Sequence, residues 1–246
     1  GQYIHCSDRG GPVGGGVSEY LVRKASGCYQ ISDEMSWTEG ALVEPLAVSV
    51  HGLRIGHLKG NETIAVIGSG TIGLTTITAA RQLGAGKIFA TYRHSQQANM
   101  AKTLGADGVA ISDGNEFEEM VLNATDGRGA DLTVETVGGS GNETLRQSFE
   151  VTRRQGRVVV LGVFYGDQSV DWNKPVLKEQ TIQGSICYGI VDGIHDFERS
   201  IEMFNNKEFN LNKIVTHTYD LENIQNGFQT AYDKTQGSIK VHINQK

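Results

Sequence analysis

Residues 64–73 read Ile-Ala-Val-Ile-Gly-Ser-Gly-Thr-Ile-Gly, and this stretch decides the fold. Its first half is a continuous apolar run, which is typical of a strand buried on both faces of a parallel sheet. Its second half fits the pattern G-x-G-x-x-G and opens an amphipathic segment at residues 71–83, which predicts a helix. Glycine turns alone are common in strand–helix connections. A turn placed between a buried strand and a helix is typical of a dinucleotide-binding site.

Each glycine of this turn has its own expected role. Gly68 would make the tight turn after the strand, Gly70 would let the backbone approach a pyrophosphate, and Gly73 would let the helix pack closely against the strand. The free N–H groups and the dipole at the helix start favour negatively charged phosphates. The residues expected to contact the cofactor here are Gly68, Ser69, Gly70, Thr71, Ile72 and Gly73.

The rest of the chain continues the alternation of strands and helices. Strands are expected at residues 87–91, 108–111, 131–136, 157–161 and 181–186, and helices at residues 95–104, 115–123 and 142–149. This order indicates the α/β class with a doubly wound parallel sheet, the Rossmann fold. Outside it, a strand at 17–22, helices at 196–204 and 221–232 and a strand at 238–243 are expected. Pro45 interrupts a helical pattern, so a kink or a helix start is expected there.

The residues at the end of the second strand bear on the choice of cofactor. NAD-binding folds place an Asp or Glu about 20 residues after the glycine motif, where it binds the ribose hydroxyl. Tyr92 occupies that position here, and Arg93 follows it. An arginine pairs with a ribose 2′-phosphate through charge-assisted hydrogen bonds, so the sequence favours NADP(H) over NAD(H). The alternative is that Arg93 simply begins a solvated helix.

Composition and charge exclude several classes of function. The chain has 246 residues, of which 38% are hydrophobic, and a net charge of −6, which is ordinary for a globular protein. It has no basic stripe, so nucleic acid is not an expected partner. It has no apolar run of about eighteen residues, so no membrane span is expected. Its three cysteines are scattered and there is no signal peptide pattern, so a cytoplasmic setting is expected.

Several further motifs resemble the medium-chain, zinc-type alcohol dehydrogenases, and most closely the polyol and threonine dehydrogenase branch. They are Gly-Gly-Val-Ser-Glu-Tyr at 15–20, Ala-Leu-Val-Glu-Pro-Leu-Ala at 41–47, Gly-Ala-Asp at 105–107, Gly-Arg-Gly-Ala-Asp at 127–131 and Glu-Thr-Val-Gly at 135–138. The resemblance covers nearly the whole chain. It implies hydride transfer between a small-molecule alcohol or ketone substrate and nicotinamide, assisted by a catalytic zinc that polarises the alcohol oxygen.

The resemblance also implies further site residues. Val137, Gly138, Gly162 and Val163 are expected to line the cofactor cleft. Ser185 and Ile186 are expected to approach either the nicotinamide or the subunit interface. The strand at 181–186 is expected to pair with its copy in a second subunit and so form a homodimer. The alternative for this strand is an ordinary sheet edge covered by the tail of the chain.

Glu44 is the residue that the resemblance places at the catalytic zinc, as a ligand or near-ligand. Sequence chemistry alone favours a different interpretation, in which this carboxylate interacts with the dipole of a helix N-terminus. In the family, the other zinc ligands are a cysteine and a Gly-His-Glu segment from a preceding domain, and this sequence contains neither in that arrangement. Cys6 resembles the fourth cysteine of the family's structural-zinc lobe.

These observations predict a dehydrogenase that lacks the N-terminal part of its catalytic domain. Residues 1–45 and 190–246 would be remnants of a GroES-like, β-rich catalytic domain, and residues 46–189 would form the dinucleotide-binding Rossmann domain. The predicted function is that of an NAD(P)(H)-dependent alcohol or polyol dehydrogenase in truncated form. One alternative is a non-catalytic dinucleotide-binding module without a zinc site. The other is a zinc-independent quinone reductase, against which the motif Glu44-Pro45-Leu46 argues.

Overall fold

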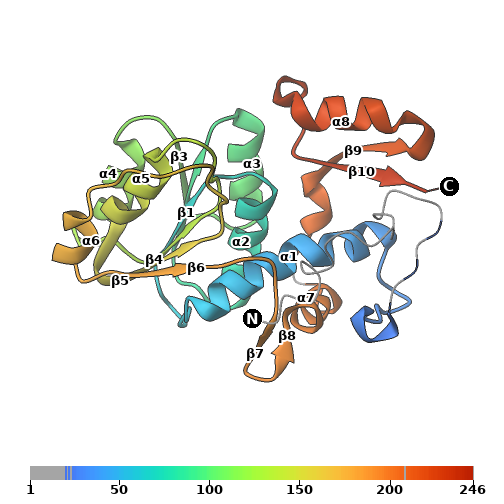
Figure 1. Cartoon of the computed structure of the whole chain (residues 1–246), viewed down its shortest axis with the longest axis horizontal. Helices are drawn as coiled ribbons and strands as arrows, with labels where there is room; N and C mark the ends of the chain where they lie inside the picture. Colours follow the sequence, from blue (N-terminus) through green and yellow to red (C-terminus); the bar gives the residue numbers. More distant parts are fainter. Residues whose placement is uncertain (1–19, 21, 23, 208, 246) are drawn as a thin grey trace.

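The computed structural model describes residues 20, 22, 24–207 and 209–245. Its main sheet has six strands in the order β3-β2-β1-β4-β5-β6, and all neighbouring strands are parallel (Figure 1). The strands are β1 (Ile64–Ile67), β2 (Ile88–Tyr92), β3 (Gly108–Ile111), β4 (Ala130–Glu135), β5 (Thr152–Val160) and β6 (Thr181–Gly184). This is the order of two halves that meet between β1 and β4, so the Rossmann fold expected from the sequence is confirmed.

β1 lies in the middle of the sheet and contributes to the hydrophobic core on both of its faces. Successive side chains of a strand point to opposite faces. Ile64 and Val66 pack into one core, whereas Ala65 and Ile67 pack into the other, and all four are buried. The uninterrupted apolar run follows from this position, because a strand covered by helices on both faces has no side that meets water.

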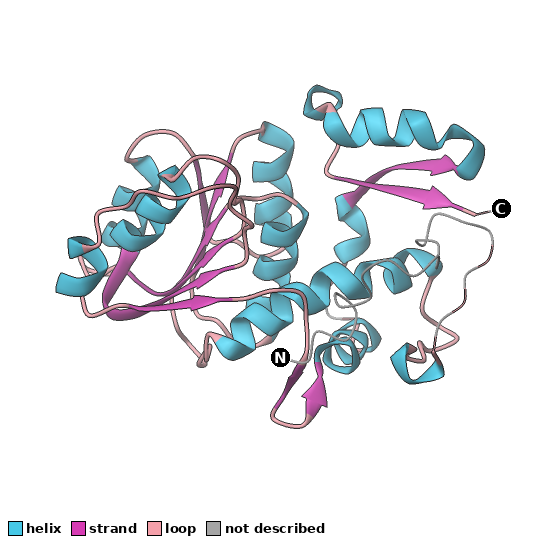
Figure 2. Ribbon diagram, viewed as in Figure 1, coloured by secondary structure: helices cyan, strands magenta, loops and turns pink. Residues whose placement is uncertain are grey.

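Helices cover both faces of the sheet (Figure 2). One core contains side chains of α1 (Trp37–Ile55), α2 (Thr71–Gln82), α3 (Ser95–Thr103) and α7 (Asp196–Asn205), and the other contains side chains of α4 (Glu116–Ala124) and α5 (Glu143–Val151). The short α6 (Asn173–Leu177) lies beside α5. No helix in the described part of the chain is both long enough and apolar enough to cross a membrane.

The C-terminal part of the chain forms a smaller layer that lies apart from the main sheet (Figure 1). β9 (Val215–Asp220) and β10 (Lys240–Asn244) are parallel, and α8 (Ile224–Tyr232) packs against both. A small hairpin of β7 (Ile190–Val191) and β8 (Ile194–His195) precedes α7. α6, β7 and β8 were not expected from the sequence, because they are too short to show a hydrophobic period. β9 was not expected either, because that strand has no fully buried residue and hence no apolar run.

α1 begins at Trp37 with a reciprocal cap. The Ser36 hydroxyl accepts from the Glu39 N–H at 3.2 Å, and the Glu39 carboxylate accepts from the Ser36 N–H at 2.7 Å. The helix continues through Pro45 to Ile55, so the expectation of a helix start at Pro45 is wrong. The expected domain boundary after residue 45 falls inside this helix. The expected strand at 17–22 and Cys6 lie mostly or wholly outside the described residues.

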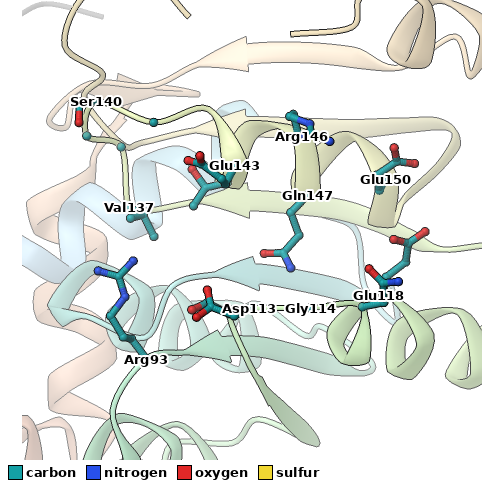
Figure 3. A pocket seen from close by; sticks show the side chains of 16 residues that line it. Arg93, Asp113, Gly114, Glu118, Val137, Ser140, Glu143, Arg146, Gln147 and Glu150 are labelled. Carbon is teal, nitrogen blue, oxygen red and sulfur yellow. The ribbon is translucent and has the colours of Figure 1, made fainter. Parts of the chain in front are cut away.

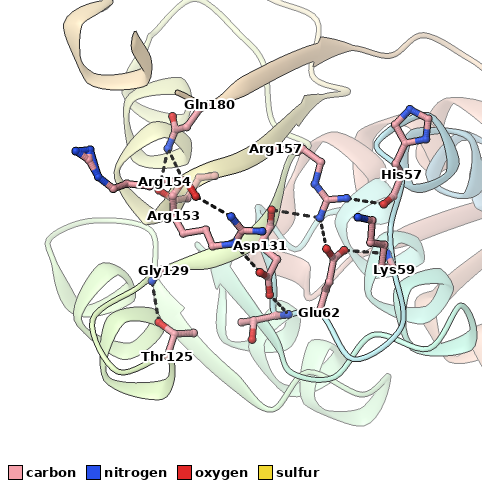
Figure 4. Close-up of polar contacts among 12 residues, drawn as sticks. His57, Lys59, Glu62, Thr125, Gly129, Asp131, Arg153, Arg154, Arg157 and Gln180 are labelled. Carbon is pink, nitrogen blue, oxygen red and sulfur yellow. Dashed lines mark hydrogen bonds and ion pairs between the residues drawn. The ribbon is translucent and has the colours of Figure 1, made fainter. Parts of the chain in front are cut away.

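Two arginines of β5 join the amino ends of the central strands (Figure 4). The Arg153 Nε donates to Asp131 at 2.6 Å, and the Thr63 N–H donates to the same carboxylate at 2.8 Å. Arg157 forms an ion pair with Glu62. Burial alone would raise the pKa of Asp131, but the bonds from Arg153 and Thr63 outweigh it and lower that pKa. This polar network closes the end of the sheet opposite the glycine turn.

β5 is longer than the sequence indicates. It begins at Thr152 rather than at Arg157, because the register against β4 shifts between Ala130 and Leu132. Gln155, inside the shifted segment, has a φ of 53°, as a bulged residue can. A polar, bulged segment carries no apolar periodicity, so its pairing was not apparent from the sequence.

A buried carboxylate fixes α7 to α1. Asp196 is fully buried. Its oxygens lie 2.7 Å from Nδ1 of His51 and 2.6 Å from Nη1 of Arg54, and they accept from the Gly189 N–H at 2.8 Å. Burial alone would raise the pKa of Asp196, but these hydrogen bonds outweigh it and lower the pKa below its ordinary value. The same carboxylate therefore also holds the segment that follows β6.

Candidate cofactor site

The glycine turn joins β1 to α2 at the carboxyl edge of the sheet. Gly68 has a φ of 98°, which favours glycine, and a Cβ on it would lie 2.5 Å from Cγ2 of Val137. A Cβ on Gly73 would lie 1.9 Å from the Gly68 carbonyl oxygen, so only glycine lets the helix approach the turn so closely. A Cβ on Gly70 would meet no atom within 4 Å. The backbone at Gly70 therefore borders open space that a ligand can reach.

Neighbouring strands hold this turn in place. The Gly68 N–H donates to Oγ1 of Thr91 in β2, and the Ser69 hydroxyl donates to the carbonyl of Thr91, both at 2.7 Å. On the other side, Oγ1 of Thr136 donates to the Ile67 carbonyl at 2.8 Å. The first N–H groups of α2 have no partner within the helix, as at every helix start, and the positive end of its dipole lies at this turn.

A cavity of about 280 Å³ opens beside the turn, and we call it the turn cavity. Its walls come from the glycine turn after β1, the ends of β2, β3 and β4, the starts of α3 and α5, and the C-terminal layer. Its lining residues are Gly68, Ser69, Gly70, Thr91, Tyr92, Arg93, His94, Gln97, Ser112, Thr136, Val137, Thr144 and Lys234. None of these lining residues carries a carboxylate, whereas Arg93 and Lys234 are cationic. The turn cavity therefore suits an anion.

Tyr92 and Arg93 lie at the end of β2, where the sequence placed them. Tyr92 is the last residue of the strand, and the exposed Arg93 follows it. The side-chain oxygen of Gln97 accepts from the N–H groups of Arg93 and His94, each at 3.1 Å, and so fixes the connection to α3. No ion pair within the described part of the chain engages the Arg93 guanidinium, which leaves it available to a ligand.

A second cavity of about 750 Å³ continues along the same edge (Figure 3). The residues that it shares with the turn cavity are Arg93, Ser112, Val137 and Thr144. In Figure 3, Arg93 extends from one wall toward Val137 on the other. The carboxylates that line this larger cavity belong to Asp113, Glu118, Glu143 and Glu150, and they outnumber the arginines that line it. The cleft thus changes from cationic at the turn to mainly acidic between α4 and α5.

The ends of β4 and β5 meet closely beside this cleft. The Glu135 carboxylate accepts from the N–H groups of Val137 and Gly138, each at 2.9 Å. A Cβ on Gly162 would lie 2.3 Å from the Gly138 nitrogen, so glycine is required for this approach. Of the residues that the resemblance implied, Val137 and Gly138 line the larger cavity. The ones that line neither of these two cavities are Gly162, Val163, Ser185 and Ile186.

Glu44, on α1, lines neither cavity. Glu44 is exposed as a whole, but partial burial of its carboxyl group raises the pKa of that group. The nearby positive charge of Lys240 lowers the same pKa by a smaller amount. Within the residues that the structure describes, no three His, Cys, Asp or Glu side chains are grouped so that they could hold a metal ion. A zinc site in a protein takes three or four such ligands. The described residues therefore do not by themselves fit a catalytic zinc.

Comparison with known families identifies the class of protein to which this cleft belongs. The family model of the zinc-binding dehydrogenases matches residues 71–206, more than half of the chain. The chain belongs to this family. The matched span begins at the first residue of α2 and ends just after α7, so most of the main sheet of this chain lies within it. The family that the sequence motifs resembled is confirmed.

Relatives that match the chain are named as alcohol dehydrogenase-like proteins or as butanediol and sorbitol dehydrogenases. The zinc-type alcohol dehydrogenase-like protein YdjJ of Escherichia coli is 30% identical over 226 residues, which are 92% of this chain and 63% of that protein. The (R,R)-butanediol dehydrogenase of Bacillus subtilis is 31% identical over 235 residues, 94% of this chain and 65% of that protein. The crystal structure of 2R,3R-butanediol dehydrogenase from Bacillus subtilis has a TM-score of 0.77 at 29% identity, over 89% of this chain and 60% of that chain. The chain spans less than two thirds of each of these relatives.

Seven residues that line the turn cavity were not among the site residues expected from the sequence: Thr91, His94, Gln97, Ser112, Thr136, Thr144 and Lys234. Gln97 stands three residues after His94, and this N-terminal helix spacing was a usable signal. Thr91 lies inside a strand, where threonine is common and therefore gives no sign of a binding role. Lys234 lies far along the chain, and only the tertiary fold brings it to the cavity.

Proposed function

We propose that this chain binds NADP(H) in preference to NAD(H) along the carboxyl edge of its main sheet. The observation that carries the proposal is the turn cavity, which Arg93 lines and to which no described residue contributes a carboxylate. The pyrophosphate would lie over Gly70, and the 2′-phosphate would lie against Arg93. An acidic side chain in place of Tyr92 would instead bind a ribose hydroxyl and repel that phosphate.

The larger cavity fits the uncharged part of the same ligand. The adenine ring would extend past Arg93 and Val137, where the cleft widens and its lining becomes less cationic. The bond network of Glu135 would support this wall by fixing the N–H groups of Val137 and Gly138. This orientation leaves the nicotinamide half for the opposite side of the turn, toward the ends of β4, β5 and β6.

We further propose that the protein transfers hydride between a secondary alcohol or ketone and nicotinamide. Bound nicotinamide supplies the hydride donor and acceptor. Support comes from relatives named butanediol dehydrogenase and sorbitol dehydrogenase. The part played by the described residues is to bind and orient the cofactor, through the start of α2 and through Arg93. No step at a metal is assigned to them.

A non-catalytic dinucleotide-binding module is a second candidate function. This function needs only the glycine turn and the turn cavity, and it places no role on a metal ion. Zinc analysis of the purified chain, with an assay of 2,3-butanediol and sorbitol oxidation by NADP⁺, separates the two functions. Bound zinc with turnover supports the dehydrogenase. NADPH binding without zinc or turnover supports the module.

We also propose a homodimer that forms through β6. All four residues of this strand are exposed at the edge of the sheet. Ile182 in β6 is 36% exposed, and Ile186, just after the strand, is 49% exposed. This edge of the sheet is therefore partly apolar, and no strand in the described part of the chain pairs with it. An edge strand of this kind readily pairs with another strand, and a second copy of β6 would continue the sheet.

Calorimetric titration with NADPH and NADH tests the cofactor proposal. We expect a lower Kd for NADPH. The variant Arg93→Ala should raise the Kd for NADPH roughly tenfold or more and leave the Kd for NADH nearly unchanged, since it removes a charge-assisted bond to a phosphate that NADH lacks. Arg128→Ala is the control, because Arg128 is exposed and lines neither cavity. A lower Kd for NADH in the unaltered chain would overturn the proposal.

A further inference from the structure

The turn cavity contains a second cation, on a segment far from β2 in the sequence. Lys234 begins the short 3₁₀ turn Lys234–Gln236, which follows α8. It is half-buried and lines the turn cavity together with Tyr92 and Arg93. We propose that Lys234 and Arg93 together bind the ribose 2′-phosphate of NADP(H), which makes Lys234 a second determinant of cofactor specificity. This inference rests on the proposed function.

Backbone contacts place Lys234 at the ribose side of the turn cavity. Its carbonyl accepts from Nε2 of Gln96 at 2.9 Å. Gln96 is the second residue of α3, and the next residue, Gln97, accepts from the Arg93 N–H at 3.1 Å. Both cations are therefore held at the first turn of α3. In a Rossmann fold the ribose lies at the end of the second strand, whereas the pyrophosphate lies at the glycine turn.

The turn that carries Lys234 is preformed. The Asp233 carboxylate accepts from the Thr235 N–H at 3.0 Å and from the Thr235 hydroxyl at 2.6 Å. Gly237 ends the turn with a φ of 78°, in the left-handed region. The backbone of Lys234 thus needs no rearrangement to present its ammonium group to the turn cavity.

Lys234 lacks a counter-ion in the described part of the chain. No ion pair there includes it, and its Nζ has a long contact of 3.5 Å with the Ile239 carbonyl. Burial, and after it the nearby charge of Lys240, lower the pKa of Lys234. A phosphate dianion between Lys234 and Arg93 would supply the missing opposite charge to both cations.

Binding of two nucleotides to the full 246-residue chain tests the assignment without any need for turnover. The probes are 2′,5′-ADP, which carries the 2′-phosphate, and 5′-AMP, which lacks it. Lys234→Ala should raise the Kd for 2′,5′-ADP roughly tenfold or more and leave the Kd for 5′-AMP within about twofold. Lys234→Arg should retain the preference. Lys102→Ala is the matched control, because Lys102 is an exposed lysine near the end of α3 that lines neither cavity.

The double variant Arg93→Ala/Lys234→Ala shows whether the two cations share one phosphate. If they do, the combined loss of 2′,5′-ADP affinity should differ from the product of the single losses, since contacts to one group are coupled. Independent, multiplicative losses would contradict a shared phosphate. Thermal unfolding of each variant, expected to stay near that of the unaltered chain, checks that the fold is retained.

The outcomes distinguish failure of this inference from failure of the proposed function. An equal loss of both nucleotides in Lys234→Ala would place Lys234 at the 5′-phosphate and overturn the inference, and so would no loss of either. If the unaltered chain prefers 2′,5′-ADP and only Arg93→Ala removes the preference, the proposed function stands and this inference alone fails. If the unaltered chain binds both nucleotides equally well, the NADP(H) proposal fails and the inference with it.

Discussion

Gly70 and Gly73 stand in one turn but meet different surroundings. A side chain at position 73 would collide with the Gly68 carbonyl, whereas one at position 70 would enter open space. We therefore expect Gly73→Ala to lower the free energy of unfolding by about 1–3 kcal/mol or more, because the helix must move away from the turn. Urea denaturation measures this change. A Gly73→Ala variant as stable as the unaltered chain would contradict the close packing.

Gly70→Ala is the complementary variant. Its methyl group should leave the free energy of unfolding nearly unchanged, since Gly70 has a φ of −75° that alanine adopts readily. The Kd for NADPH should rise, because the methyl group occupies the space assigned to the pyrophosphate. Calorimetric titration checks this. An unchanged Kd would show that the pyrophosphate does not lie over Gly70.

At the scale of single residues, local sterics made the glycine turn predictable, and distance in the chain concealed its partners. The roles of Gly68 and Gly73 follow from backbone geometry within one turn, so a local motif reveals them. The position of Arg93 follows from the length of one βαβ unit. Lys234 reaches the same cavity through the packing of the C-terminal layer, for which no local pattern exists.

At the scale of elements, a charged anchor joins α7 to α1. Asp196→Asn would leave Arg54 and His51 facing a neutral side chain in a buried place. We expect a loss of about 3–5 kcal/mol in the free energy of unfolding at pH 7, since breaking a buried ion pair leaves the remaining charge buried without a counter-ion. Glu202→Gln, in an exposed pair with Arg199, should change it by less than about 1 kcal/mol. Urea denaturation of both variants makes the comparison.

The same anchor predicts a dependence on pH. The pKa of Asp196 is lower in the folded chain than its ordinary value, so ionised Asp196 stabilises the fold above the unfolded pKa of about 3.9. That stabilisation is lost as the pH falls through the folded pKa. The stability difference between the unaltered chain and Asp196→Asn should therefore shrink below about pH 4. A constant difference from pH 7 to pH 3 would contradict this.

Elements that are marked by a clear run or repeat of apolar residues were predictable from the sequence. Elements whose bounds depend on a helix cap or on a paired strand were not. β1 and β3 have the expected bounds, because apolar residues closed by turns mark a buried strand. The start of α1 depends on the cap at Ser36 rather than on the conspicuous Pro45. The polar strand β9 is defined by its pairing with β10, which the sequence does not display.

At the scale of the whole molecule, the exposed edge at β6 predicts the oligomeric state. We expect the chain to sediment as a dimer, and Ile182→Lys to sediment as a monomer with an unchanged circular dichroism spectrum, because like charges would face each other across the new pair. Phe228→Lys on α8 is the control, since Phe228 is an apolar residue that is 62% exposed, away from β6. A monomeric unaltered chain would contradict the dimer.

Within the described residues, no three His, Cys, Asp or Glu side chains are grouped so that they could hold a metal ion. The turn cavity, where we propose that the phosphates bind, is lined by glycines, hydroxyl groups, Gln97, His94, Val137 and the cations Arg93 and Lys234. Treatment with EDTA should therefore leave the Kd for NADPH unchanged, because none of the described residues that we propose to contact the cofactor belongs to a group that could hold a metal ion. Titration before and after chelation measures this. A Kd that rises after chelation and recovers with zinc would show that metal binding shapes the cleft.

The contrast between Gly70 and Gly73 also bears on how this chain evolves. A fold that requires Gly73 for its own packing keeps that glycine under selection whether or not a nucleotide is used. A Cβ on Gly70 would meet no atom within 4 Å, so under the proposed function Gly70 is constrained by the ligand alone, and a lineage that abandons dinucleotide binding is free to replace it. Substitution at position 70 with retention of position 73 would then record loss of the ligand in a descendant that still folds.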